Sequence, residues 1–473
     1  MNGGSMTTLS RISMAAVAAL VVGVSSANAA DLGGNCCADL EERIAELEAT
    51  TARKGTRKVS LTISGQISQE LLFWDDGIRN DMYVTGPNSS NSRWRFLGQA
   101  KISPEVSAGF LYEFQVYGSA SSGVNQTNGG DDGGATLNGT GSGLGMLREA
   151  MAWIEHSRLG RISIGHGSTA GNNAILVDLS GKGMAASNGV FLHPAAFVLN
   201  SRTLAAINPS THGYMASGTW GNFFQGTGDW LNTRNEHIQY RTPTVAGFSL
   251  GASVGEDNYW DVEGRYSAEF NGVRIASRLA YSELSEFNGA SGAMTCTTQC
   301  QKKLDQLAGS LSVRHMPTGL FFTGAAGWRK VHRQDGVATD FDNDDGDATL
   351  QLGNNTDFKS SFFYLSAGVA RNITGLGDTV FYGEYSEWKG VAQDVNFSAQ
   401  LGDVGPFESL RVSAFGSGQD KLTHWGLGIV QHIDAAAMEF WLAYKNYSMS
   451  GPMHDIAQFQ DLHSVTAGTR IRF

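Results

Sequence analysis

The densest group of chemically active side chains is a run of five aspartates within one polar segment. Its members are Asp340, Asp342, Asp344, Asp345 and Asp347. Counting back from Gly346 puts Phe341 where the calcium-binding loop of an EF-hand needs its first oxygen ligand, so the run fails as an EF-hand. We interpret it as a solvated acidic loop, with a loose divalent-cation site as the less favoured alternative.

Nucleophiles and metal ligands are present but are not arranged for catalysis. His166-Gly167-Ser168 lacks the G-x-S-x-G pattern of a hydrolase nucleophile, and no H-E-x-x-H, Walker A or paired C-x-x-C sequence occurs. Several other histidines stand singly, which favours isolated polar groups over ligands; they are His193, His212, His315, His424 and His432. The sequence therefore predicts no catalytic residues, no metal and no cofactor.

The charged pattern that does suggest a function is an alternation of arginine with aromatic residues. Arg93 and Arg95 alternate with Trp94 and Phe96, and successive residues of a β-strand point to opposite faces. If the aromatic face meets lipid, both arginines must face water, because a charged arginine near the middle of a bilayer costs about 2–4 kcal/mol. This consequence depends on whether the surrounding chain forms strands that cross a membrane.

The chain after the N-terminal segment is dominated by a period of two. Apolar and polar residues alternate in about 16 segments, each close to the length that a tilted membrane-spanning strand requires. The predicted strands are Val59–Ser68, Arg93–Ile102, Glu105–Gly118, Leu147–His156, Arg161–His166, Glu236–Thr242, Gly247–Gly255, Tyr259–Phe270, Val273–Leu284, Leu304–His315, Leu320–Val331, Lys359–Arg371, Asp378–Trp388, Leu422–Ile433, Ala437–Tyr447 and Asp461–Phe473. The sequence thus predicts an all-β fold, a transmembrane antiparallel up-and-down β-barrel of about 16 strands.

The connections between these segments alternate between short and long. Ser103-Pro104 and Asn271-Gly272 are short, whereas Ser119–Met146 and Ser168–Asn235 are long; the connection near Glu256 is the one exception. Tight periplasmic turns and long external loops are typical of outer-membrane barrels. All 8 prolines fall outside the predicted strands, as expected where a missing N–H would interrupt the hydrogen-bond ladder.

The longest connection, Ser168–Asn235, contains no alternating run and is rich in glycine, asparagine, serine and aromatic residues. A structureless segment this long is uncommon in a compact fold unless it is a functional loop packed against its own scaffold. Its aromatic residues, among them Trp220 and Trp230, argue against disorder. We expect this loop to fold into the mouth of the barrel and narrow it, with a disordered surface excursion as the alternative.

The N-terminus has the features of a secretory signal peptide over residues 1–29. Arg11 precedes the short apolar run Met14–Val24, and Ala27-Asn28-Ala29 provides a cleavage site. Residues 30–57 follow and contain a heptad seam. The seam includes Leu40, Ile44 and Leu47. We expect a short periplasmic helix that joins copies of the chain; because two heptads alone are marginal, a solvated amphipathic tail is the alternative.

The protein has 4 cysteines, which fall as two close pairs. In an oxidising compartment, Cys296 and Cys300 are expected to form a disulfide within an external loop, whereas Cys36 and Cys37 support no firm expectation. The formal net charge of -11 argues against nucleic acid as a partner.

Several stretches resemble a known family. The segment NCCADLEERIAELEATTARKGTRKVSLTISGQISQELLFWDDG is similar to the mature N-terminus of the alphaproteobacterial porin family. SRWRFLGQAKI, AGFLYEFQVY, LREAMAWIEHSRLGRISIGHGST and the terminal VTAGTRIRF resemble general porins more widely. The resemblance implies a homotrimer of such barrels, each narrowed by its third external loop, with Phe473 as the outer-membrane assembly signal.

The resemblance also implies a pore constriction between a basic wall and the third loop. Arg93 and Arg95 correspond to the wall arginines of the second strand and Arg148 to that of the fourth, although alternation alone leaves the side of Arg148 open. Where many porins have Gly-Arg before the third loop, this chain has Gly165-His166, which makes the expected wall less basic at neutral pH. The acidic groups expected to oppose this wall are Asp178 and Asp229.

These observations leave two classes of function. The favoured class is an outer-membrane channel for passive diffusion of small hydrophilic solutes and ions, surrounded by outer-membrane lipid and lipopolysaccharide; a sugar-specific porin, with Trp220 and Trp230 as a slide, is a variant of it. The alternative is a surface adhesin or structural barrel with a closed lumen, and an outer-membrane enzyme is a distant third. The third loop separates the two classes, because a channel needs that loop inside the lumen beside a water-filled gap.

Overall fold

The computed structural model describes the barrel and parts of its loops. The described residues are 58–116, 119–127, 129, 145–187, 197–202, 214–220, 234–256, 258–285, 301–333, 350–352, 358–390, 395–397, 414–415, 420–451, 454–455 and 458–473. The predicted signal peptide, the heptad seam, the Cys296 and Cys300 pair and Asp229 lie outside these residues, so these expectations stay predictions. Among the described residues, no helix is long and apolar enough to cross a membrane.

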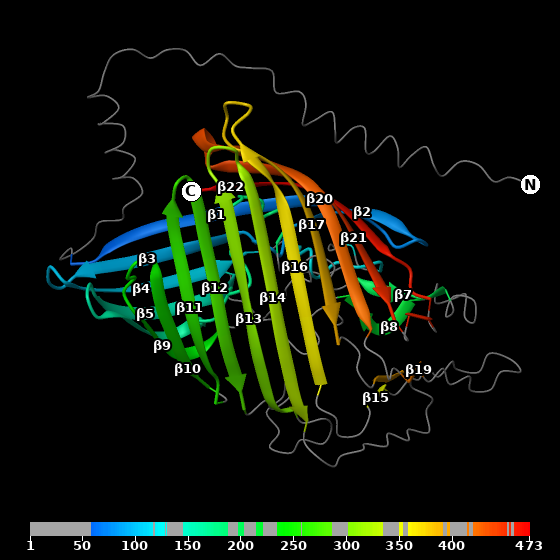
Figure 1. Cartoon of the computed structure of the whole chain (residues 1–473), viewed down its shortest axis with the longest axis horizontal. Helices are drawn as coiled ribbons and strands as arrows, with labels where there is room; N and C mark the ends of the chain where they lie inside the picture. Colours follow the sequence, from blue (N-terminus) through cyan, green and yellow to red (C-terminus); the bar gives the residue numbers. More distant parts are fainter. Residues whose placement is uncertain are drawn as a thin grey trace, which may run out of the picture. The chain divides into compact units, whose positions relative to one another are not determined.

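Sixteen antiparallel strands close into a barrel (Figure 1). In chain order they are β1 (Ser60–Asp75), β3 (Arg93–Lys101), β4 (Val106–Gln115), β5 (Met146–His156), β6 (Gly160–Ser168), β9 (Arg234–Arg241), β10 (Phe248–Gly255), β11 (Trp260–Phe270), β12 (Val273–Leu284), β13 (Gln301–His315), β14 (Leu320–Arg333), β16 (Phe358–Arg371), β17 (Thr379–Lys389), β20 (Lys421–Ile433), β21 (Met438–Ser450) and β22 (Leu462–Arg472). Each strand pairs with the next barrel strand, and β22 pairs with β1 to close the sheet. The predicted fold class and strand number are confirmed.

Further strands lie in the connections. The strand β3 pairs with β1 only as far as Gln66, which leaves the rest of that edge of β1 free. The short strand β2 (Asn80–Thr85) pairs with this free part of β1, from Glu70 to Asp75. The others are β7 (Val198–Asn200), paired with β8 (Tyr214–Thr219), and a small sheet of β15 (Leu350–Leu352), β18 (Val395–Phe397) and β19 (Ala414–Phe415); a 3-10 turn, η3 (Asp434–Ala436), joins β20 to β21. The sequence predicted a loop at β2 because its alternation is short.

The last residue completes the seam of the barrel. Phe473 N–H donates to Gly65 O (3.0 Å), and Gly65 N–H donates to Phe473 O (2.8 Å). The aromatic ring lies against this glycine, where an added Cβ would stand 2.6 Å from Phe473 Cζ. Gly65 therefore leaves room for the ring, while the role of Phe473 as an assembly signal stays a prediction.

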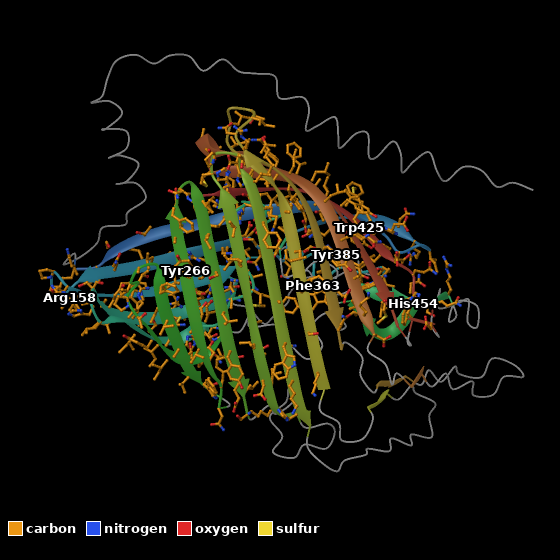
Figure 2. All side chains as sticks on the ribbon, in the orientation of Figure 1. Arg158, Tyr266, Phe363, Tyr385, Trp425 and His454 are labelled. Carbon is orange, nitrogen blue, oxygen red and sulfur yellow. The ribbon has the colours of Figure 1, made fainter. Side chains whose placement is uncertain are left out.

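Side chains alternate across most of the barrel wall, with polar groups inside and apolar groups outside. On β6, Ile162 and Ile164 are 52% and 56% exposed. By contrast, the hydroxyls of Ser312 on β13 and Thr323 on β14 are buried inside and lie 2.9 Å apart. Figure 2 shows outward aromatic side chains as well, among them Phe363, Tyr385 and Trp425. An apolar outer face is what the hydrocarbon of a bilayer requires.

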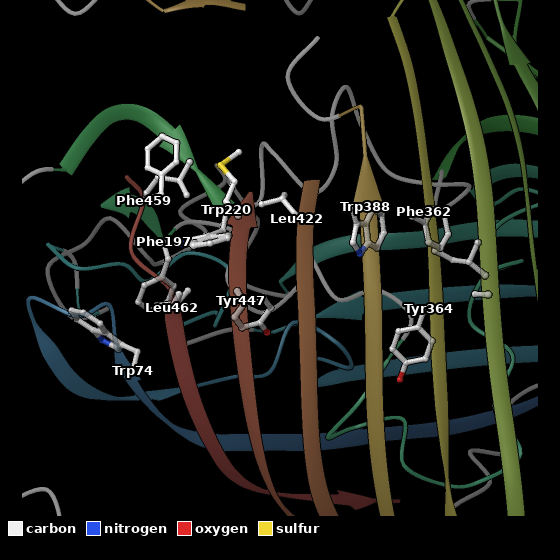
Figure 3. Packing of buried hydrophobic residues seen from close by; sticks show 14 of the residues in the cluster. Trp74, Phe197, Trp220, Phe362, Tyr364, Trp388, Leu422, Tyr447, Phe459 and Leu462 are labelled. Atoms are coloured by element: carbon white, nitrogen blue, oxygen red, sulfur yellow. The ribbon is translucent and has the colours of Figure 1, made fainter. Parts of the chain in front are cut away.

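The inner face carries a large apolar cluster at strand ends that are joined by long connections. Trp388 stacks on Phe362 with 4.3 Å between ring centroids, and Trp74 of β1 meets Phe197 of the third long connection edge to face at 5.3 Å. Figure 3 shows this cluster, whose buried members also include Trp220, Leu422, Tyr447 and Leu462. The polar-inside pattern fails here because the third connection covers these residues as a protein core would.

Candidate functional site

The third long connection enters the barrel directly after β6. Its first part, residues 169–182, is called the inner arm below. Inward side chains of the wall accept hydrogen bonds from its backbone: Ala170 N donates to Ser253 Oγ (2.7 Å), Gly171 N to Asp261 Oδ2 (2.7 Å), Val177 N to Ser310 Oγ (3.0 Å) and Leu179 N to Ser312 Oγ (3.0 Å). Since these acceptors belong to the inner faces of β10, β11 and β13, the inner arm lies inside the barrel, as the sequence predicted.

Arg278 of β12 holds the start of the inner arm. Its guanidinium donates to Asn172 O (2.7 Å), Asn173 O (3.1 Å) and Ala170 O (3.4 Å). One side chain thereby satisfies carbonyls that a chain outside regular secondary structure would otherwise have to pair with water. Sequence analysis missed Arg278, because its role depends on a contact between residues 106 positions apart in the chain.

Asp178 lies on the inner arm and is bound by its neighbours. Its Oδ1 accepts hydrogen bonds from Ser180 Oγ (2.6 Å) and Ser180 N (3.1 Å) and lies 3.7 Å from Lys182 Nζ. The Lys182 side chain is 1% exposed, and its ammonium lies 5.5 Å from the ring centroid of Tyr364. The carboxylate that the sequence predicted to oppose the basic wall is therefore compensated by a cation on the same arm.

The inner arm is expected to keep its place over a wide range of pH. Burial alone would raise the pKa of Asp178, but Lys182 and the Ser180 hydrogen bonds together hold this pKa below its usual value. A carboxyl group whose pKa is lower in the folded protein than in the unfolded chain stabilises the folded state at pH values above its pKa in the unfolded chain. This stabilisation is lost as the pH falls through its pKa in the folded protein. Single-channel conductance and open-channel noise should therefore stay constant from about pH 8 to about pH 5, and the arm should loosen only below about pH 4.

Asp178→Asn provides the comparison for this prediction. The variant lacks the titrating carboxyl. Any change in conductance or noise that begins near pH 4 in the wild type should therefore be absent from the variant. A wild-type transition centred above pH 5 would show that another group controls the position of the arm.

Beyond Lys182 the chain packs on apolar side chains of the wall. Met184, Ala185 and Ala186 are buried in a cluster with Trp441 of β21. Ser89 Oγ, from the connection between β2 and β3, donates to Met184 O (3.3 Å). The third connection thus follows the wall from β10 to β21, and in the strand order of the barrel β3 to β5 lie opposite β13 to β16.

Three guanidiniums converge on one buried carboxylate across β3, β4 and β5. Glu113 Oε1 lies 2.7 Å from Arg148 Nε and 3.2 Å from Arg93 Nη1, and Glu113 Oε2 lies 2.9 Å from Arg95 Nε. The Glu113 side chain is 2% exposed, whereas that of Arg95 is 44% exposed. We call Arg93, Arg95 and Arg148 the basic wall; with Glu113 they carry three positive charges against one negative charge. Fixed charges in a narrow aqueous passage act strongly on passing ions.

A β-bulge explains why Arg148 reaches the lumen. The register of β4 with β5 pairs Glu113 with Glu149 and Phe114 with Leu147, so Arg148 is the extra residue. A bulge breaks the two-residue alternation locally, which is why the sequence left the side of Arg148 open. Arg148 and Glu149 therefore face the lumen together, although they are neighbours in the chain.

Glu149 binds both ends of the third connection. Its Oε1 accepts a hydrogen bond from Ser168 Oγ (2.6 Å), where β6 ends, and lies 3.9 Å from Arg234 Nε, where β9 begins. Ser168 and Arg234 are also register partners in the sheet. The two ends of the third connection are thus held together by a residue of the neighbouring strand β5.

Ser90 joins the basic wall to the last strand. Its Oγ accepts hydrogen bonds from Gln66 Nε2 (2.8 Å), Arg470 Nη1 (3.1 Å) and Arg93 Nη2 (3.4 Å). Arg470 also pairs with Glu439 at 2.6 Å. The basic wall therefore extends from β22 to β5. The position of Arg470 follows from the alternation of the last strand, but Ser90 lies in a non-periodic connection that carries no such signal.

His166 lies on the outer face of the barrel. It pairs in register with Ala150 and Glu236, and its Nδ1 lies 3.3 Å from Glu236 Oε1. The same face of β6 carries Ile164, which is 56% exposed. The predicted place of His166 in the constriction is therefore wrong, because β6 keeps its alternation up to this residue and the chain turns inward only beyond it.

The geometry defines a class of protein. Within the described part of the chain, no group of three or more His, Cys, Asp or Glu side chains could hold a metal ion. A closed β-barrel with an apolar outer face, a charged inner wall and a loop packed inside is a channel-forming barrel of the bacterial outer membrane. The chain belongs to the Gram-negative porin family, whose profile matches residues 15–468. It forms an outer-membrane channel for passive diffusion.

Solved structures with this fold come from several bacteria. The chain is similar to the anion-selective porin from Comamonas acidovorans, with 15% sequence identity and a TM-score of 0.50 over 88% of this chain and 100% of that one. It is also similar to OmpF of Salmonella typhi in complex with daunomycin, with 14% identity and a TM-score of 0.47 over 89% and 100% of the two chains. No curated protein sequence matches the chain.

Proposed function

We propose that the channel is constricted between the inner arm and the basic wall, and that it prefers anions. The observation that carries this proposal is the convergence of Arg93, Arg95 and Arg148 on the single buried carboxylate of Glu113. The acid on the inner arm is compensated by its own lysine, so the arginines set the field across the passage. Small hydrophilic anions then pass more readily than cations of the same size. The name of the Comamonas acidovorans porin, anion-selective, supports this preference.

The double substitution Arg93→Ala with Arg95→Ala tests the proposal. We expect a higher single-channel conductance, because two long side chains leave the passage, and a shift of selectivity toward cations, because two positive charges leave the wall. Conductance and reversal potentials in a salt gradient across a planar bilayer measure both effects.

Arg158→Ala is the matched control for this test. Arg158 lies in a short turn (Figure 2), pairs only loosely with Glu105 at 3.5 Å and is 81% exposed, so its loss removes one arginine charge without touching the basic wall. Unchanged conductance and selectivity in the double variant would falsify the constriction at the basic wall.

We further propose how the chain is exported and assembled. Residues 1–29 act as a signal peptide, residues 30–57 contribute to a homotrimer, and outer-membrane lipid and lipopolysaccharide surround the barrel. Membership of the porin family and the closed barrel support a channel without catalytic activity. The heptad seam described above supports the trimer.

A further inference from the structure

A second group of arginines lies on the inner wall, away from Glu113. Glu263 of β11 is contacted by Arg265 Nε (2.5 Å), by Arg241 Nη1 of β9 (3.8 Å) and by Arg278 Nε of β12. The Glu263 side chain has 0% exposure. The arrangement repeats the one at Glu113, since one buried carboxylate holds three guanidiniums together against their mutual repulsion.

Arg161 of β6 extends this second group. It is the register partner of Arg241, its guanidinium lies 4.2 Å from the ring centroid of Trp153, and its Nη2 lies 2.6 Å from Glu155 Oε2. The group then contains four guanidiniums and two carboxylates, and four minus two leaves a charge of +2.

The members of the group differ in how they use their donors. Arg278 donates to carbonyls of the inner arm. The other three are partly open to the lumen: the side chains of Arg161, Arg265 and Arg241 are 41%, 34% and 24% exposed. Each guanidinium has five N–H donors, so these three retain donors that face water.

The second group reaches from mid-strand positions of β11 and β12 to the end of the barrel where the turns are short. Arg161 is close behind the turn at residues 157–159, and Arg241 is the last residue of β9, before the turn at residues 242–247. Arg93, by contrast, begins β3 directly after a long connection. Because short turns face the periplasm in outer-membrane barrels, the second group opens toward the periplasmic side through Arg161 and Arg241, and the basic wall lies nearer the external side.

We propose that Arg161, Arg241 and Arg265 form a binding site for small multivalent oxyanions on the periplasmic side of the lumen, an inference that rests on the proposed anion preference. Guanidiniums bind phosphate-like groups through paired N–H donors, and the excess charge favours ions that carry more than one negative charge. Buried Glu263 already holds Arg241 and Arg265 in place, so binding requires little further ordering. The passage is then asymmetric, with its oxyanion site on the periplasmic side.

One-sided block of the channel by inorganic phosphate tests this site. The probe is used at about pH 8, where phosphate is mostly divalent, with oriented single channels in a chloride salt. We expect phosphate to reduce the chloride current at lower concentration from the periplasmic side than from the external side. Arg241→Gln with Arg265→Gln should raise the blocking concentration on the periplasmic side about tenfold, which corresponds to about 1.4 kcal/mol, and should leave external block unchanged.

Two further variants make the result unambiguous. Arg274→Gln is the control for a general effect of charge near the periplasmic turns, because Arg274 forms an exposed pair with Glu269 at 2.6 Å beside the short turn after β11 and does not contact Glu263. Its block should match the wild type. Arg161→Gln does not disturb Glu263, so it carries the test if the double variant fails to insert, and it should shift block in the same direction. Equal block in the wild type and in the arginine variants would overturn the site.

The failure of this inference is distinguishable from the failure of the proposed function. A wild-type channel that prefers anions but shows equal phosphate block from both sides would remove only the periplasmic site. A wild-type channel that prefers cations would remove the anion preference, and the site with it.

Discussion

Shortening the third connection between Ala185 and Gly218 is expected to raise single-channel conductance several-fold and to admit larger sugars. The inner arm before this segment is tied to the wall by the hydroxyls of Ser310 and Ser312, and the segment itself adds Phe197 to the cluster at the barrel end. Removing it takes Phe197 away from the inner wall, while the sixteen strands of the barrel remain paired. Conductance in planar bilayers and the uptake rates of sugars of increasing size by proteoliposomes measure the effect.

Stability must be separated from pore width in this experiment. The shortened variant loses the packing of Phe197 against Trp74, and truncating a buried phenylalanine costs about 3–5 kcal/mol. Phe197→Ala is therefore the control: it should lower the heat resistance of the barrel on unboiled gels while leaving conductance close to the wild type. If the shortened variant kept both the wild-type conductance and the wild-type size limit, the segment would not restrict the passage.

Much of the barrel follows from patterns that are local in the sequence. The face of each strand residue is set by a two-residue period, and one face must meet hydrocarbon, so strands such as β11 and β22 are visible without knowledge of their partners. The strand β2 is different, because it owes its conformation to the free edge of β1 beyond Gln66. The inner apolar cluster at Trp74 and Trp388 is also invisible locally, since an inward position is polar only where water reaches it.

Residues of the site can be predicted from the sequence only where they follow the two-residue period of the strands. Arg93 and Arg95 were identified because they alternate with aromatic residues, and the structure brings both to Glu113. Arg148 depends on a bulge, and the side of His166 depends on where the alternation of β6 stops; neither is encoded by spacing alone. Lys182 could not be assigned a role, because its contact with Tyr364 joins a non-periodic loop to a strand far along the chain.

Lys182→Met is expected to loosen the inner arm from the inner wall of the barrel. Methionine keeps most of the volume of the lysine stem but leaves the carboxylate of Asp178 without its cation at 3.7 Å. Removing one partner of a buried ion pair costs about 3–5 kcal/mol, because the other charge stays desolvated. The arm should then exchange between positions, so single-channel records should show frequent conductance steps and the arm should become cleavable by added protease while the barrel strands stay protected.

The double variant Lys182→Met with Asp178→Asn identifies the cause. With both charges removed, the uncompensated carboxylate is gone, and replacing a buried pair by neutral groups is often close to neutral in stability. We expect steady conductance and protection from protease to return in the double variant, whereas Asp178→Asn alone should show a smaller defect than Lys182→Met, because its lysine still lies over the ring of Tyr364 at 5.5 Å. Equal defects in Lys182→Met and in the double variant would mean that the lysine acts through its packing and not through its charge, and the ion pair would then have no part in holding the arm.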